Sequence, residues 1–299
     1  MKKLIASGLV ILLAPAANAI LVVEDDFTDG IDTSWYTASS SSAIEMNSDS
    51  LGLVSGGSGR GIHTTFADQT LANIGDELVV SYSFNTPATV NNSDGLGSGS
   101  SGAFRVGVFD DLGRNLSQNI SASSGSPNAL YGWSVGNGGP GDAGLPGYMM
   151  DHDVNTGSGA DINFRDHNTG SATGRLMATT GSGSFSSFSS GPDAGYSFGV
   201  SSSYSGSITL KRTGATDLEL TGVFDGNSYT LTDNAADSFT FASLFFHANS
   251  NQFGSSSSAG DPDNGLDFTS YSVNFNPIPE PSSIALLGLG ALCMARRRR

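Results

Sequence analysis

The sequence predicts an all-β protein folded as an antiparallel β-sandwich, and three observations support this. Short runs of β-branched and aromatic residues alternate with clusters of glycine, serine, asparagine and aspartate, with almost no helical period. Residues 217–224 alternate between apolar and polar side chains, as a half-buried strand does, and Asp225-Gly226-Asn227 then supplies the tight turn of a hairpin. Turn signals recur at regular spacing along the chain, which is typical of a sandwich.

The strands are expected in one domain, residues 20–276. In chain order they cover residues 20–24, 51–54, 61–66, 77–84, 103–109, 161–165, 175–179, 196–200, 207–212, 217–224, 228–232, 239–247 and 266–275. The Gly/Ser-rich segments between them offer little apolar area to offset the entropy of ordering, so we expect exposed loops there. These segments are residues 91–102, 121–128, 136–147, 181–191 and 255–264.

The N-terminus has the pattern of a secretory signal peptide. Met1-Lys2-Lys3 is basic, residues 4–14 are apolar, and Ala17-Asn18-Ala19 places small residues at the two positions that signal peptidase reads. We therefore expect residues 1–19 to be removed by cleavage after Ala19.

The C-terminus, residues 277–299, has the pattern of a short membrane anchor. Prolines at alternate positions, Pro277, Pro279 and Pro281, favour a stiff, extended joint. The uncharged run 284–295 suits a transmembrane helix, but at ~1.5 Å per residue it spans only ~18–21 Å of a ~30 Å hydrocarbon core. A basic cluster then favours the cytoplasmic side; it consists of Arg296, Arg297, Arg298 and Arg299.

Pro279-Glu280-Pro281, the glycine-containing apolar run and the terminal arginines together resemble the PEP-CTERM sorting signal of exported bacterial proteins. The resemblance implies that an exosortase, a membrane cysteine protease, recognises and removes the tail. The protein would then be secreted or held at the cell surface after transient anchoring in the inner membrane. The alternative is a single-span anchor that is never cut.

The order of the strands resembles the concanavalin A-like lectin/glucanase jelly roll and its laminin-G-like relatives. Four segments carry the resemblance: Asp25-Asp26-Phe27, the strand at 104–110, the meander at 208–232 and the closing strand at 266–275. The resemblance implies a jelly-roll sandwich over most of residues 20–276. The alternative is another β-sandwich, of immunoglobulin-like or carbohydrate-binding-module type.

Charge and cysteine content exclude several function classes. The chain has 13 basic and 28 acidic side chains, net −15. Six of the basic residues and Glu280 lie in the two ends, so the domain between them carries about −20, which disfavours a nucleic-acid partner. The one cysteine, Cys293, lies in the tail, so the exported domain has no disulfide and no thiol chemistry.

The sequence does not support an enzyme. Jelly-roll glucanases need two glutamates about 5 Å apart on one strand. The domain has four glutamates, none in a Glu-x-Asp-x-x-Glu arrangement: Glu24, Glu45, Glu77 and Glu219. Serine-nucleophile chemistry is not supported, because no Gly-x-Ser-x-Gly elbow opens a strand-to-helix turn, and the histidines His63, His152, His167 and His247 are scattered. His247 is expected to be a strand cap or a surface residue.

Three segments have side chains that suit a metal ion. Asp151-His152-Asp153 and Arg165-Asp166-His167 offer oxygen and nitrogen donors, but adjacent strand residues face opposite ways, so solvated loop charges are the favoured interpretation. Asp261, Asp263 and Asn264 are oxygen donors in one loop and can hold calcium, but the loop lacks the full spacing of a calcium-binding motif, so turn chemistry is the favoured interpretation. No cofactor is expected other than this calcium.

Two tryptophans are candidates for stacking on sugar rings. Trp133, in Tyr131-Gly132-Trp133, is the candidate ligand-stacking residue, and Trp35-Tyr36 is the second aromatic pair. Large aromatic side chains more often anchor the core of a sandwich, and this interpretation is favoured for both.

Two functions remain open. The first is a non-catalytic exported protein of the cell surface or extracellular matrix, with signal peptidase and exosortase as partners during export and exopolysaccharide as a partner afterwards. The alternative is a carbohydrate-binding, lectin-like module, with a glycoside hydrolase as the third and least supported class.

Overall fold

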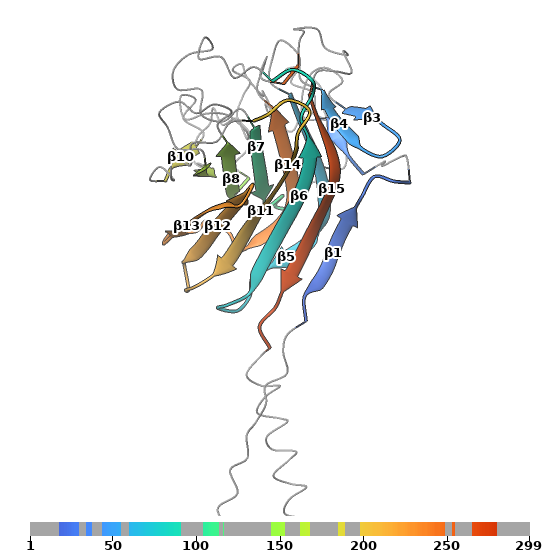
Figure 1. Cartoon of the computed structure of the whole chain (residues 1–299). Helices are drawn as coiled ribbons and strands as arrows, with labels where there is room; N and C mark the ends of the chain where they lie inside the picture. Colours follow the sequence, from blue (N-terminus) through green and yellow to red (C-terminus); the bar gives the residue numbers. More distant parts are fainter. Residues whose placement is uncertain are drawn as a thin grey trace, which may run out of the picture.

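A computed structural model shows a sandwich of two antiparallel sheets (Figure 1). The structure describes residues 18–29, 34–37, 44–54, 60–90, 104–113, 116, 145–152, 162–167, 185–188, 198–248, 253–254 and 265–279. Every named element in these ranges is a β-strand. The described residues include no helix of the length and apolarity that crossing a membrane would need.

The first sheet, sheet A, contains eight strands. Seven follow the order β13-β12-β11-β6-β15-β4-β3, and β1 pairs with β15 beside that path. Their bounds are β1 Ile20–Asp25, β3 Ile44–Met46, β4 Leu51–Val54, β6 Glu77–Asn85, β11 Ser203–Arg212, β12 Leu218–Phe224, β13 Asn227–Asp233 and β15 Gly265–Asn276.

The second sheet, sheet B, contains seven strands in the order β10-β9-β8-β7-β14-β5-β2. Their bounds are β2 Tyr36–Thr37, β5 Arg60–Thr70, β7 Phe104–Phe109, β8 Gly147–His152, β9 Ile162–His167, β10 Phe185–Ser187 and β14 Thr240–Ala248.

Alternation of side chains explains the central strands of sheet A. In β6, Leu78, Val80, Tyr82 and Phe84 are buried, and the residues between them are partly exposed. A period of two places the first set on the core face and the second on the outer face. The same alternation holds in β12, so both strands have one solvent-facing side and one core-facing side.

The predicted hairpin between β12 and β13 is present. Asp225 and Gly226 both have positive φ, 46° and 81°, and lie between the paired residues Phe224 and Asn227. Two positive φ values at the centre of a two-residue turn match the right-handed twist of the flanking strands.

The core between the sheets is dominated by aromatic rings. Phe246 of β14 stacks on Phe268 of β15 with ring centroids 4.2 Å apart, and Phe84 of β6 lies 4.8 Å from Phe104 of β7. Trp35 is buried and stacks on Phe246 at 5.5 Å. Offset and tilted pairs of this kind add to the stabilisation from buried area, and Trp35 is therefore a core anchor, as favoured above.

The two ends of the domain lie side by side. β1 pairs with β15, with Ile20 opposite Phe275 (Figure 1). Beyond β15 the chain still contacts the sandwich, because the backbone N–H of Ile278 donates to Asp76 Oδ1 at 2.7 Å. Residues 1–17 and 280–299, which include Ala17, Glu280, Pro281, the apolar run and the arginine cluster, lie outside the described residues.

Most predicted strands are present within a few residues of the expected bounds, but several predictions were wrong. Residues 198–200 are not in a strand, and β10 lies inside the expected loop 181–191. β2, β3 and β8 were not predicted. The expected strand 175–179 lies outside the described residues.

Candidate functional site

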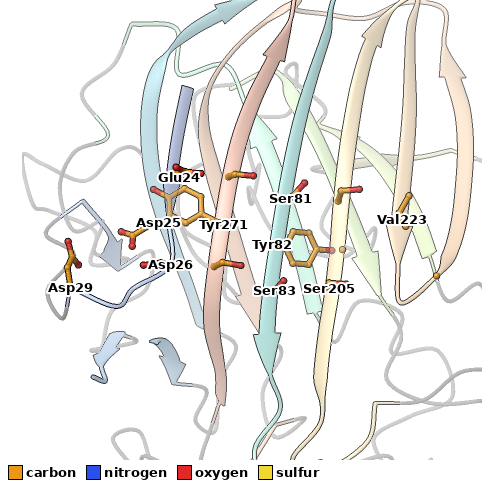
Figure 2. A pocket seen from close by; sticks show the side chains of 15 residues that line it. Glu24, Asp25, Asp26, Asp29, Ser81, Tyr82, Ser83, Ser205, Val223 and Tyr271 are labelled. Carbon is orange, nitrogen blue, oxygen red and sulfur yellow. The ribbon is translucent and has the colours of Figure 1, made fainter. Parts of the chain in front are cut away.

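An open groove of about 820 Å³ lies on the outer face of sheet A (Figure 2). Its floor is formed by β6, β11, β12 and β15, and one side is formed by the end of β1 and the turn that follows. The volume lies in the range of ~300–1,000 Å³ that is typical of ligand sites.

The floor carries two rows of serine hydroxyls across three neighbouring strands. Strand pairing aligns one row through Ser205, Ser83 and Ser270, and the next row through Ser207, Ser81 and Ser272. Adjacent strands lie ~4.8 Å apart, so each row presents hydroxyl groups at that spacing. Because serine is small, the floor stays low relative to its surroundings.

The floor is fixed from beneath by core contacts. A Cβ at Gly206 would lie 2.4 Å from the Tyr82 hydroxyl oxygen, so only glycine leaves room for this ring. The Tyr82 hydroxyl is hydrogen-bonded to His152 Nε2 of sheet B at 3.1 Å. Burial lowers the pKa of His152 to about 3, so the imidazole is neutral. The serine rows therefore stand on a rigid, neutral layer.

Four carboxylates form one side of the groove, which we call the acidic wall: Glu24, Asp25, Asp26 and Asp29. Figure 2 shows Glu24, Asp25 and Asp26 near the end of β1 and Asp29 further to the side. Among the described residues that line the groove, the charged side chains are all carboxylates.

The acidic wall is held by a structured turn. Phe27 has a φ of 57°, is buried, and stacks on Tyr271 with ring centroids 5.9 Å apart. Asp25 Oδ1 accepts from the backbone N–H of Phe27 at 2.6 Å. The hydroxyl and backbone N–H of Thr28 donate to Asp26 Oδ1, which lowers the pKa of Asp26.

The outer face of sheet B carries a second polar cluster, but it is closed to solvent. Arg165 forms an ion pair with Asp151, and Arg105 Nη1 donates to His247 Nδ1 at 3.2 Å. The four residues are 0–5% exposed. Burial lowers the pKa of Arg105 to about 10, and burial with the Arg105 charge holds the pKa of His247 well below its ordinary value.

Two further histidines on sheet B bind backbone carbonyls. His63 Nε2 donates to the carbonyl of Leu116 at 2.8 Å, and His167 Nδ1 donates to that of Leu145 at 2.6 Å. Leu116 and Leu145 belong to the connection between β7 and β8. These bonds fasten both ends of that connection to the sheet, which is a structural role.

A carboxylate cluster lies where the two sheets meet at β9 and β13. Burial, with the charges of Asp233 and Asp237, raises the pKa of Asp166 to about 7. The Tyr148 hydroxyl donates to Asp233 Oδ2 at 2.7 Å, and its own pKa is raised, mainly by burial.

The structure corrects the interpretation of the histidine-containing clusters. Asp151 and His152 lie in β8, and Arg165 and His167 in β9, all of them buried, so they are not solvated loop charges. The predicted opposite orientation is correct, because Asp151 pairs with Arg165 while His152 faces the core. His247 is also buried, so its assignment to a cap or the surface was wrong.

The remaining predicted site residues lie outside the described residues: Trp133, Asp153, Asp261, Asp263 and Asn264. Within the described ranges, no group of three histidine, aspartate or glutamate side chains is arranged to hold a metal ion. The serine rows were not predicted. Their alternation is visible in the sequence at Ser81 and Ser83, but the alignment of three strands is not.

Residues 277–299 match the family model of the PEP-CTERM protein-sorting motif. This motif indicates export to the cell surface or extracellular space in bacteria. A search of the curated proteins finds no match to the chain.

Several solved structures resemble the chain at low identity. The metal-free carbohydrate recognition domain of Emp46p is 9% identical, with 85% of this chain and 96% of that chain covered, at a TM-score of 0.46. The Ca²⁺/Man3GlcNAc-bound exoplasmic/lumenal domain of VIP36 is 9% identical over 84% and 87%, at 0.45. A mutant of alginate lyase Aly36B in complex with alginate trisaccharide is 13% identical over 89% and 100%, at 0.44. Likenesses this distant carry no ligand or activity over to this chain.

Proposed function

We propose that this chain is a non-catalytic protein of the cell surface or extracellular matrix whose sandwich binds extracellular polysaccharide in the serine-lined groove. An exosortase processes it through residues 277–299 after transient anchoring in the inner membrane. The single observation that supports binding is the groove itself, with two aligned hydroxyl rows on its floor.

The chemistry of the groove suits a sugar polymer. Hydroxyl groups both donate and accept hydrogen bonds, as sugar hydroxyls do, and carboxylates accept strong ones. The groove is open rather than enclosed, so it can accommodate a segment of a long polysaccharide whose ends extend beyond the protein. The core layer beneath keeps the hydroxyl rows in place, which lowers the entropic cost of binding.

The test measures binding of the exported protein, purified from culture medium, to the exopolysaccharide of the producing cells by co-sedimentation. Ser83→Tyr places a large ring on the groove floor and is expected to weaken binding about tenfold or more, about 1.4 kcal/mol. Thr230→Tyr is the matched control, because Thr230 is exposed on β13 of the same sheet, outside the groove. Circular dichroism checks that both variants fold.

Three results would contradict the proposal. If the wild-type protein does not bind the exopolysaccharide, the sandwich has a purely structural role. An equal loss in both variants would place the binding elsewhere on the molecule. Release of reducing sugar from the polysaccharide would show a catalyst instead.

We also propose that Asp261, Asp263 and Asn264 bind a calcium ion, independently of the groove. Removal of calcium with a chelator is expected to lower the melting temperature of the exported protein, since a ligand that binds the folded state stabilises it. An unchanged melting temperature would exclude this site.

A further inference from the structure

We propose that the polysaccharide bound in the groove carries free amines, as a partly or fully deacetylated amino-sugar polymer does. This inference rests on the proposed function and names the class of its ligand. It follows from two independent features of the same groove: the hydroxyl rows of the floor and the charge of the acidic wall.

The charge of the groove selects against acidic polymers. Four carboxylate residues line the groove: Glu24 pairs with Ser272 of the floor, Asp25 pairs with the core-facing Tyr271, and Asp26 and Asp29 follow in the turn. Among the described residues the other lining side chains are uncharged. Each repulsion between like charges at ~4 Å costs about 1 kcal/mol even in bulk water. A polymer of uronic or sulfated sugars would meet this repulsion along the whole wall, whereas protonated amines would be attracted to it.

The spacing of the charges suits a polymer. Figure 2 shows Glu24, Asp25 and Asp26 near the end of β1, with Asp29 set apart on the side away from the serine-bearing strands. A ligand with a charge on each sugar can meet more than one of these carboxylates. The serine rows run across β11, β6 and β15 toward β1, where Glu24 pairs with Ser272. One polysaccharide chain can thus contact the serine hydroxyls and the carboxylates together.

The carboxylates of the acidic wall are fixed in place before a cation binds. The bonds from Thr28 hold the carboxylate of Asp26, and the buried ring of Phe27 fixes the turn on which Asp25 and Asp26 stand. Carboxylates fixed before binding lose little side-chain entropy when an amine arrives. Ammonium–carboxylate hydrogen bonds are stronger than those between neutral groups.

The test compares three oligosaccharides of equal length by isothermal titration calorimetry with the exported protein. They are a chitosan oligomer with free amines, the fully acetylated chitin oligomer and an alginate oligomer. We expect the chitosan oligomer to bind at least tenfold more tightly than the chitin oligomer and the alginate oligomer to bind most weakly. Added salt should weaken only the chitosan complex, since exposed charges are screened within ~8 Å at physiological ionic strength.

Variants separate the wall from the overall charge of the protein. The double variant Glu24→Gln/Asp26→Asn should lose at least tenfold in affinity for chitosan and leave chitin binding unchanged. The control Asp49→Asn/Asp68→Asn removes two exposed carboxylates outside the groove and should change chitosan affinity less than twofold.

The outcomes distinguish this inference from the function on which it rests. Equal binding of chitin and chitosan, or an equal loss in the wall and control variants, would overturn the amine preference and leave polysaccharide binding intact. Failure to bind these probes and the producer's own polysaccharide would overturn both.

Discussion

At the scale of residues, the buried ion pair of sheet B shows that burial decides how much an ion pair contributes to the stability of the fold. Arg165 and Asp151 are both buried, and Asp151 would be left as a buried charge without Arg165. Lys211 and Glu77 also form an ion pair, 3.0 Å long, but both side chains are about a third exposed. Water screens the second pair, and it cannot screen the first.

We therefore predict that Arg165→Leu lowers the free energy of unfolding by about 3 kcal/mol or more. The matched change Lys211→Leu at the exposed pair should cost less than about 1 kcal/mol. Urea unfolding followed by circular dichroism measures both. Similar costs for the two variants would contradict the role assigned to burial.

Asp166 gives a prediction for pH. Because its pKa is raised from 3.8 to about 7, the folded protein retains a proton that the unfolded chain releases between these values. Its stability contribution therefore falls as the pH rises from about 4 to 7. Asp166→Asn removes this loss, so its melting temperature should exceed that of the wild type increasingly up to pH 7 and match it near pH 4. A constant difference across this range would refute the assignment; Asp68→Asn, on the exposed part of β5, serves as the control.

At the scale of elements, two glycines with positive φ show what a turn and a pair of neighbouring strands each require of the backbone. A Cβ at Gly226, in the β12–β13 turn, would meet nothing within 4 Å, whereas one at Gly265 would lie 1.9 Å from the carbonyl oxygen of Leu53. Gly226→Ala should cost about 1 kcal/mol for the backbone conformation alone.

Gly265→Ala should cost several times as much as Gly226→Ala, because β15 must move away from β4 to accommodate the methyl group. Thermal unfolding of the two variants gives the comparison. A Gly265 variant as stable as the Gly226 variant would mean that the approach of these strands is not needed.

The elements also show what could be predicted from the sequence. Strands with one wet and one dry face, such as β6 and β12, have a visible alternation and were predicted. β7 and β14 are buried on both faces and were still predicted, from their aromatic and β-branched residues. β8 is also buried on both faces, but it has one tyrosine and no β-branched residue, so neither alternation nor composition marked it as a strand. The acidic start Asp25-Asp26-Phe27 was noted as part of a family pattern, but the groove depends on strand neighbours far apart in sequence, such as Ser83 and Ser205. Local patterns do not contain that pairing.

At the scale of the whole molecule, the sorting function of residues 277–299 is tested by whether they are removed on export. We predict that mass spectrometry of the exported protein finds a C-terminus upstream of Arg296, with the tail removed. Replacing Pro279, Glu280 and Pro281 together by alanine should leave the full-length chain in the membrane fraction. An exported protein that retains its terminal arginines would contradict processing.

The pairing of β1 with β15 determines how the domain is oriented on a surface that carries it. Ile20 and Phe275 are neighbours, so the chain enters and leaves the sandwich at one pole. A tether at either terminus would hold the domain by that same pole, and exchanging one tether for the other would not turn it over. Glu24 and Asp25 lie at the other end of β1 and Asp26 and Asp29 follow it, so the acidic wall would stand farther than Ile20 from whatever surface carries the protein.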